Sequence, residues 1–136
     1  MSAIDPDGLK TTLVTTYDYG FGTHSAILIE TEGMPPLLYD PAGTFPKMGS
    51  GDTMEDVTLD QYVKYQKSTG SRVVTTVLNT TVDQEKAMRK WLEGNRGMAP
   101  GFCASGVSSA LNGACGIGGS MFPGTLKKQA EKAKCP

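Results

Sequence analysis

Residues 100–111 read PGFCASGVSSAL, and the expected fold is built around this segment. Its proline and glycine interrupt the preceding segment, and the apolar residues that follow recur at helical spacing. We therefore expect a loop leading into a helix that has Cys103 in its first turn. A helix N-terminus carries unpaired N–H groups and a partial positive charge, which can lower a cysteine pKa from about 8.5 to roughly 3.5–7.5. Cys103 is thus the best nucleophile candidate, and the alternative is a small buried apolar side chain.

The length of the chain and its net charge exclude several classes of protein. The 136 residues predict one domain, residues 1–136, with its own core. A formal net charge of -1 without any block of Lys or Arg argues against a nucleic-acid groove or an anionic membrane surface. No apolar run is long enough to span a bilayer. We expect no Sec-type signal peptide, so the protein either stays in the cytoplasm or leaves by a route without a cleaved signal.

The chain has three cysteines, so pairing two of them leaves one thiol. Cys115 and Cys135 both follow the expected Cys103 helix, and we expect them to form a disulfide in an oxidising compartment. In a reducing compartment all three would be thiols. The three cysteines and His24 could also make a four-ligand zinc site, but no pair has the short spacing typical of zinc ligands. We therefore assign no metal and no cofactor.

Segments rich in β-branched residues predict an antiparallel sheet. The expected strands are residues 10–17, 23–31, 37–40 and 71–79. Residues 42–57 hold many small and polar residues and are expected to form a long surface loop. Together with the helices, these segments predict an α+β fold, in which the Cys103 helix packs on a sheet of about four to six strands.

Two capping boxes predict where helices begin. Thr58 and Thr81 are the expected N-caps, and each precedes a glutamine by three residues. The second helix carries large apolar residues on one face: Met88, Trp91 and Leu92. A basic segment at residues 125–134 predicts a last, solvated helix.

His24 is the only histidine, so any imidazole chemistry must use it. It begins the strand at 23–31, and a histidine is the usual base for a thiol nucleophile near neutral pH. Asp40 ends the next strand, where a carboxylate could accept a hydrogen bond from the imidazole and fix its tautomer. The alternatives are a histidine with a structural hydrogen bond and an aspartate that ends its strand before a proline. Asp18 and Glu30 are weaker candidates for Asp40's role.

Tyr17 and Tyr19 flank the glycine-rich turn that precedes His24. A tyrosine hydroxyl there could complete an oxyanion hole beside the backbone N–H of Cys103. The alternative is that both rings pack as core or rim residues.

The order of these residues resembles the circularly permuted branch of the papain-like, NlpC-type cysteine peptidases. The matching segments are residues 23–29 (THSAILI), 38–43 (LYDPAG) and 102–107 (FCASGV). In that family the cysteine is the nucleophile, the strand histidine is the base, and a third polar residue orients the histidine. The resemblance therefore implies a permuted papain-like fold with these roles for Cys103, His24 and Asp40.

Members of this family usually cleave amide bonds in cell-wall peptides, and one permuted branch transfers lipid acyl groups. The small size, the missing signal peptide and the expected disulfide also resemble amidase effectors of the type VI secretion system. The resemblance implies a cysteine amidase or endopeptidase that acts on peptidoglycan in a rival's periplasm, with a cognate immunity protein as partner. The alternatives are a thiol acyltransferase or protein deamidase with the same triad, and a non-catalytic interaction module stabilised by zinc or a disulfide.

Overall fold

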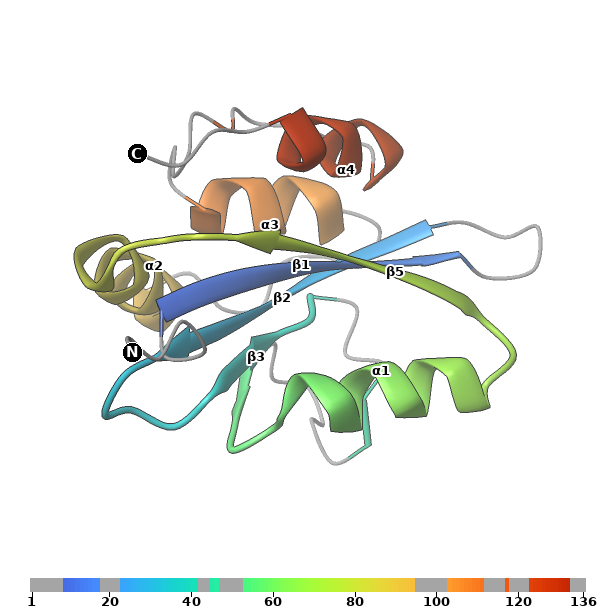
Figure 1. The fold of residues 1–136 in the computed structure, drawn as a ribbon, viewed down its shortest axis with the longest axis horizontal. Helices are drawn as coiled ribbons and strands as arrows, with labels where there is room; N and C mark the ends of the chain where they lie inside the picture. The colour runs from blue at the N-terminus through green and yellow to red at the C-terminus, as the bar shows by residue number, and fades with distance from the viewer. Residues whose placement is uncertain are drawn as a thin grey trace, which may run out of the picture.

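The computed structural model describes residues 9–17, 23–41, 45–46, 53–94, 103–111, 117 and 123–132. They form an α+β fold with a five-stranded antiparallel sheet in the order β4-β3-β2-β1-β5 (Figure 1). The strands are β1 (Leu9–Tyr17), β2 (Thr23–Thr31), β3 (Leu37–Tyr39), β4 (Thr53–Glu55) and β5 (Arg72–Leu78). The helices of this part of the chain are α1 (Leu59–Ser68), α2 (Val82–Gly94), α3 (Cys103–Leu111) and α4 (Pro123–Lys132).

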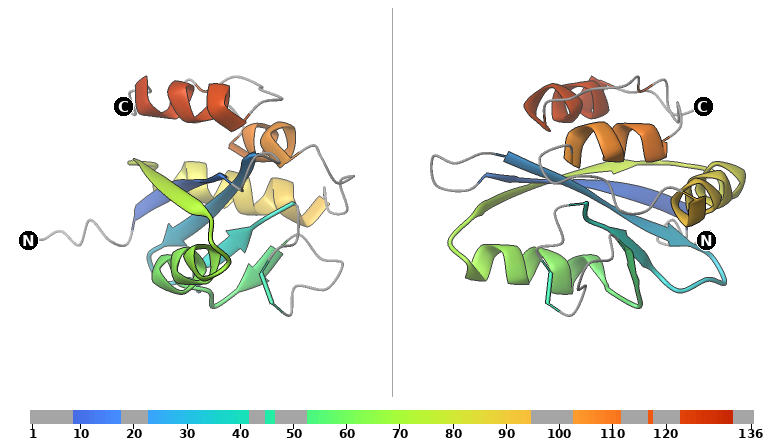
Figure 2. Two further views of the ribbon diagram at one scale, coloured as in Figure 1. Left: turned by 90° about the vertical axis from the view of Figure 1, so that its right-hand side faces the viewer. Right: turned by 180° about the vertical axis from the view of Figure 1, so that it is seen from behind.

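The pleat of the central strands sends alternate side chains into two separate hydrophobic clusters. In β2, Ile27 and Ile29 pack with residues of α2, α3 and α4, and this side of the sheet is called the α3 face below. Ala26 and Leu28 pack with residues of α1, on the side called the α1 face. Figures 1 and 2 show α3 and α4 on one side of the sheet and α1 on the other. Because helices cover both faces, β2 is apolar on both.

A tight turn joins β2 to β3. Gly33 has a φ of 80°, which glycine adopts without steric cost, and the backbone N–H of Met34 donates to the carbonyl of Thr31 at 3.0 Å. The short connection places β3 directly beside β2, so the end of β3 runs back toward the beginning of β2.

Both predicted capping boxes are present. Thr58 accepts from the Gln61 backbone N–H at 3.1 Å, and the Gln61 side chain accepts from the Thr58 N–H at 3.0 Å. Thr81 and Gln84 exchange the same two bonds, at 3.1 and 2.9 Å. The expected apolar face of α2 is confirmed, since Met88 and Leu92 are buried and Trp91 packs against them.

Two predictions need correction. The segment 42–57 is not only a surface loop, because β4 pairs with β3 and Val57 is buried on the α1 face. The last helix is not fully solvated, because Leu126 and Ala130 lie in the core on the α3 face. These two residues are four apart, so one stripe of an otherwise basic and polar helix faces the sheet.

Candidate functional site

The helix predicted to carry the nucleophile begins at Cys103, as expected. The rest of its apolar face is confirmed, since Val107, Ala110 and Leu111 are fully buried on the α3 face. The first turn holds no acidic residue, so no carboxylate there offsets the partial positive charge of the helix N-terminus. The structure describes the backbone of Cys103, whereas its side chain lies outside the described part.

His24 and Asp40 lie on neighbouring strands and on the same face of the sheet. The β2–β3 register pairs Ile27 with Tyr39, and continuing it by one residue puts Asp40 opposite Ala26. His24 lies two residues before Ala26, so His24 and Asp40 are diagonal neighbours, a spacing that long side chains can bridge. The expectation that the hairpin brings these two residues to adjacent strands is therefore confirmed.

Asp40 is fully buried against α1. The hydroxyl of Tyr62, itself buried, donates to Oδ2 of Asp40 at 2.9 Å. Gln66 lies one turn further along α1 and is also buried. The ring of Phe45 packs 5.8 Å from the ring of Tyr62, centroid to centroid. These contacts hold the Asp40 carboxylate in one position.

Sequence reasoning missed Tyr62 and Gln66. Their spacing of four residues was the available signal, because it puts two side chains with polar ends on one stripe of a capped helix. Nothing in the sequence, however, shows that this stripe faces Asp40, which lies 22 positions before Tyr62 in the chain.

The predicted catalytic residues are divided between the two faces of the sheet. His24 alternates with Ser25 in β2, and it shares the α1 face with Ala26 and Leu28. The helix that begins at Cys103 packs on the opposite, α3 face. The strand pairing thus brings His24 to Asp40, but it turns the His24 side chain away from the face on which α3 lies.

Two buried hydroxyl side chains lie on the α3 face near the start of β2. Ser25 pairs with Thr15 across β1 and β2, and both side chains are completely buried. Their hydroxyls have no hydrogen-bond partner among the described residues. Leaving a buried hydroxyl unsatisfied costs about 1–3 kcal/mol. Sequence reasoning missed this pair, because threonine and serine in a strand are ordinary residues.

Tyr17 ends β1 and is partly buried. The guanidinium of Arg72 lies 4.5 Å from the centre of its ring, a cation–π contact between neighbouring strands. The predicted role of its hydroxyl in an oxyanion hole stays a prediction. Tyr19 lies outside the described residues.

A second polar cluster joins α2 to the sheet. Glu85 is buried, and its Oε2 accepts from the Thr80 hydroxyl at 2.6 Å. Thr80 also shares a hydrogen bond of 3.0 Å with Thr11 of β1. Burial raises the pKa of Glu85, and the hydrogen bonds to its carboxylate only partly offset this effect.

Arg89, one turn after Glu85, holds the β2–β3 connection. Burial lowers its pKa, while the negative charge of Glu85 acts in the opposite direction. Its guanidinium donates at 3.0–3.1 Å to three oxygens, those of the Thr31 hydroxyl and of the Ile29 and Pro35 carbonyls. A hollow of about 110 Å³ beside Arg89 has none of the predicted site residues in its lining. The hydrogen bonds of Arg89 thus connect α2 to the end of β2 and to the β2–β3 turn.

Among the described residues, no group of three or more His, Cys, Asp or Glu side chains is placed to hold a metal ion. Cys115 and Cys135 lie outside these residues, so their disulfide and the zinc alternative stay predictions. In the part of the chain that the structure covers, no helix has the length and apolarity needed to cross a membrane.

Comparison with known proteins identifies no relative. No protein-family model, no curated protein and no solved structure matches this chain. The class defined by the structure is an α+β domain with an antiparallel sheet, and function must be argued from its residues.

Proposed function

We propose that this chain is a cysteine hydrolase that cleaves amide bonds in peptidoglycan peptides. Cys103 is the nucleophile, His24 is its base, and Asp40 orients the imidazole. The observation that carries the proposal is the start of α3 at Cys103, on a helix that packs against β2, the strand to which His24 belongs.

The proposed reaction has two steps. In the first, the Cys103 thiolate attacks the amide carbonyl, and backbone N–H groups at the start of α3, with a hydroxyl of Tyr17 or Tyr19, bind the oxyanion. The C–N bond then breaks, and the leaving amine takes a proton from the His24 imidazolium. In the second step, water loses a proton to His24 and attacks the thioester, which releases the carboxylic acid and the thiolate.

The environment of Asp40 supports its role. Its carboxylate is buried and accepts from Tyr62, so its position is fixed before substrate binds. An aspartate held in this way, diagonal to His24 on the next strand, suits the orientation of an imidazole.

The pleat of β2 is the observation that opposes the proposal. His24 is the second residue of β2 and shares the α1 face with Ala26, whereas α3 covers the other face. A His24–Cys103 contact therefore needs the start of β2 to leave the pleat, and this movement would also take the imidazole away from Asp40, which is buried on the α1 face. His24 belongs to the last two pairs of the β1–β2 ladder, Thr16–His24 and Tyr17–Thr23. Strand ends are the part of a sheet that opens at the lowest free-energy cost.

The finer parts of the proposal rest on the order of the motifs. These finer parts are a circularly permuted papain-like architecture, delivery by a type VI secretion system into a rival's periplasm, and a cognate immunity protein. The five-stranded antiparallel sheet with α3 against it is compatible with this architecture.

The test is to incubate the protein with peptidoglycan fragments and weigh the products. Wild-type protein should yield two products whose masses sum to the substrate plus one water, and Cys103→Ala should yield none. Ser109→Ala is the matched control, because Ser109 is an exposed residue of the same helix. Full activity of Cys103→Ala contradicts the proposal. Ammonia release from a protein, or acyl transfer without uptake of water, identifies one of the alternative thiol enzymes.

A further inference from the structure

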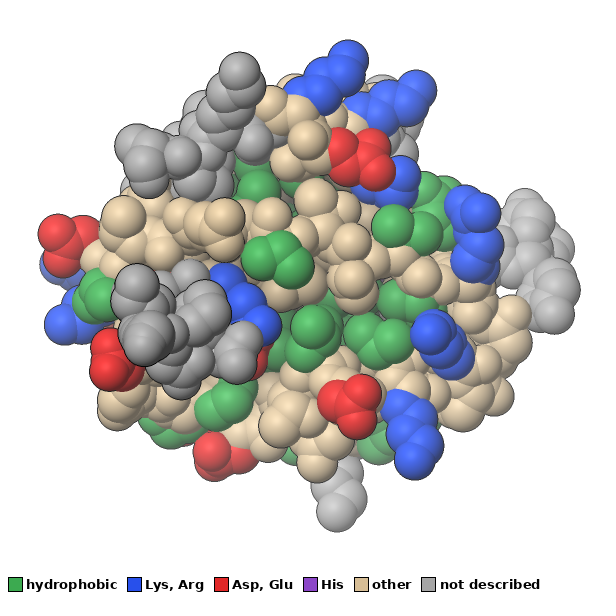
Figure 3. All heavy atoms as spheres, in the orientation of Figure 1, with side chains coloured by type: hydrophobic (Ala, Val, Ile, Leu, Met, Phe, Trp, Pro, Cys, Tyr) green, Lys and Arg blue, Asp and Glu red, His purple; other side chains and the backbone are tan. Residues whose placement is uncertain are grey.

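β5 forms one edge of the sheet, and no described element pairs with its outer side. After Arg72 its sequence is VVTTVL, without a charge, proline or glycine. Thr75 is exposed, and the Val77 side chain is 52% exposed. Figure 3 shows hydrophobic side chains gathered in the band between α1 and α4, where Figure 1 places β5.

The other edge of the sheet is protected. β4 has only three residues, ends in the charged Glu55, and is followed by Asp56 with a φ of 64°, which turns the chain away. Short length and charge are the usual means by which proteins prevent an edge strand from pairing. β5 has seven residues and carries no charge after Arg72, so its outer edge and the exposed Val77 are suited to pairing with another strand.

We propose that β5 pairs antiparallel with β5 of a second copy, so that the two five-stranded sheets become continuous. A two-fold axis through Thr75 puts Val73 of each copy opposite Val77 of the other, on the α1 face. It also puts Val74 opposite Thr76 on the α3 face. The same-face valine pairs make this strand complementary to itself, and cross-strand pairs of β-branched residues stabilise a sheet.

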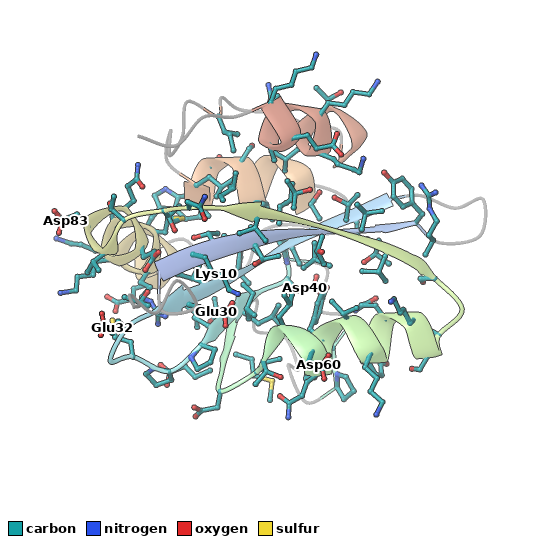
Figure 4. All side chains as sticks on the ribbon, viewed as in Figure 1. Lys10, Glu30, Glu32, Asp40, Asp60 and Asp83 are labelled. Atoms are coloured by element: carbon teal, nitrogen blue, oxygen red, sulfur yellow. The ribbon has the colours of Figure 1, made fainter. Side chains whose placement is uncertain are left out.

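Charge favours a second copy over another extended peptide. The end of the molecule at which β5 begins is basic, with Lys67 in the last turn of α1 and Arg72 as the first residue of the strand. The end at which β5 finishes carries the exposed Asp83 in the first turn of α2, next to the exposed Lys86 (Figure 4). The two-fold axis brings the basic end of each copy toward Asp83 of the other copy.

The size of the contact sets the expected strength. A stable interface buries about 1,200–2,000 Å² in total, which is more than a seven-residue strand pair supplies alone. α1 and α4 pack on opposite faces of the sheet beside β5 and would add to the contact. We therefore expect a dimer whose population depends on concentration.

The experiment is sedimentation velocity across a range of protein concentrations. Wild-type protein should change from monomer to dimer, and Thr75→Lys should raise the dissociation constant at least tenfold, because two lysines then meet on the axis. Met34→Lys is the matched control. It places a lysine at the other large apolar side chain that is exposed in the described part, 40% exposed at the β2–β3 turn, and should leave the dimer intact.

Far-ultraviolet circular dichroism checks that each variant folds, and Val77→Lys replaces Thr75→Lys if the latter does not. Wild-type protein that stays monomeric at every concentration overturns the proposal, even if β5 then binds an extended peptide. Equal weakening by Thr75→Lys and Met34→Lys overturns it as well, because the contact would then not be at β5.

Discussion

Glu85 is the residue whose protonation the fold alters most clearly. Burial raises its pKa above the ordinary value of 4.5, so the folded protein binds this proton more tightly than the unfolded chain does. The contribution of Glu85 to the free energy of unfolding is therefore fully present below about pH 4.5, and it is lost as the pH rises through the raised pKa. Arg89 moderates the effect through its positive charge.

We predict that Glu85→Gln removes this loss of stability with rising pH. Glutamine keeps an oxygen that can accept from Thr80 but carries no charge to desolvate. Urea unfolding from pH 4 to pH 8 should show a steeper fall for wild-type protein than for Glu85→Gln. Glu93→Gln, at an exposed residue of the same helix, should follow wild type. Parallel curves for wild type and Glu85→Gln would contradict this assignment.

Sequence reasoning found residues that one short turn brings together, and it missed residues that come into contact only when distant elements pack. The proximity of His24 and Asp40 followed from one short hairpin, because a hairpin fixes which residues lie opposite. Tyr62 reaches Asp40 only after α1 has packed under the sheet. Local patterns carry no information about such a contact.

The elements with strong local signals were predicted well. Both capping boxes contain their two reciprocal hydrogen bonds, and the long strands have enough alternating or β-branched residues to be recognised. β4 was missed because three residues are too few to show alternation. The buried stripe of α4 was missed because only Leu126 and Ala130 form it within a ten-residue helix.

α4 provides a direct test of this packing. We predict that Leu126→Ala lowers the free energy of unfolding by about 2–5 kcal/mol, because it removes a fully buried side chain between α4 and the sheet. Lys128→Ala, at an exposed position of the same helix, should change it by less than about 0.5 kcal/mol. Chemical denaturation measures both. A similar small effect of the two variants would mean that α4 does not belong to the core.

For the whole molecule, the sequence could not show on which face of the sheet each helix packs. β2 is apolar on both sides, so Ile27 and Ile29 offer α3 no better surface by pattern than Ala26 and Leu28 do. The structure puts α3 on the face opposite His24. The helix start, the strand histidine and the aspartate were therefore all predicted in the right elements, but the sequence could not show that the pleat places His24 and α3 on opposite faces of the sheet.

The central claim is that His24 acts on the Cys103 thiol, and alkylation measures this directly. Iodoacetamide modification of the reduced protein is followed against pH by peptide mass spectrometry, with the thiols of Cys115 and Cys135 as internal references. In wild-type protein Cys103 should react with a midpoint well below about pH 8.5, the value for a free cysteine, because both the helix N-terminus and an imidazolium lower its pKa. His24→Ala should move that midpoint upward. Identical profiles in the two proteins would contradict the dyad and agree with the pleat of β2, which points His24 toward α1.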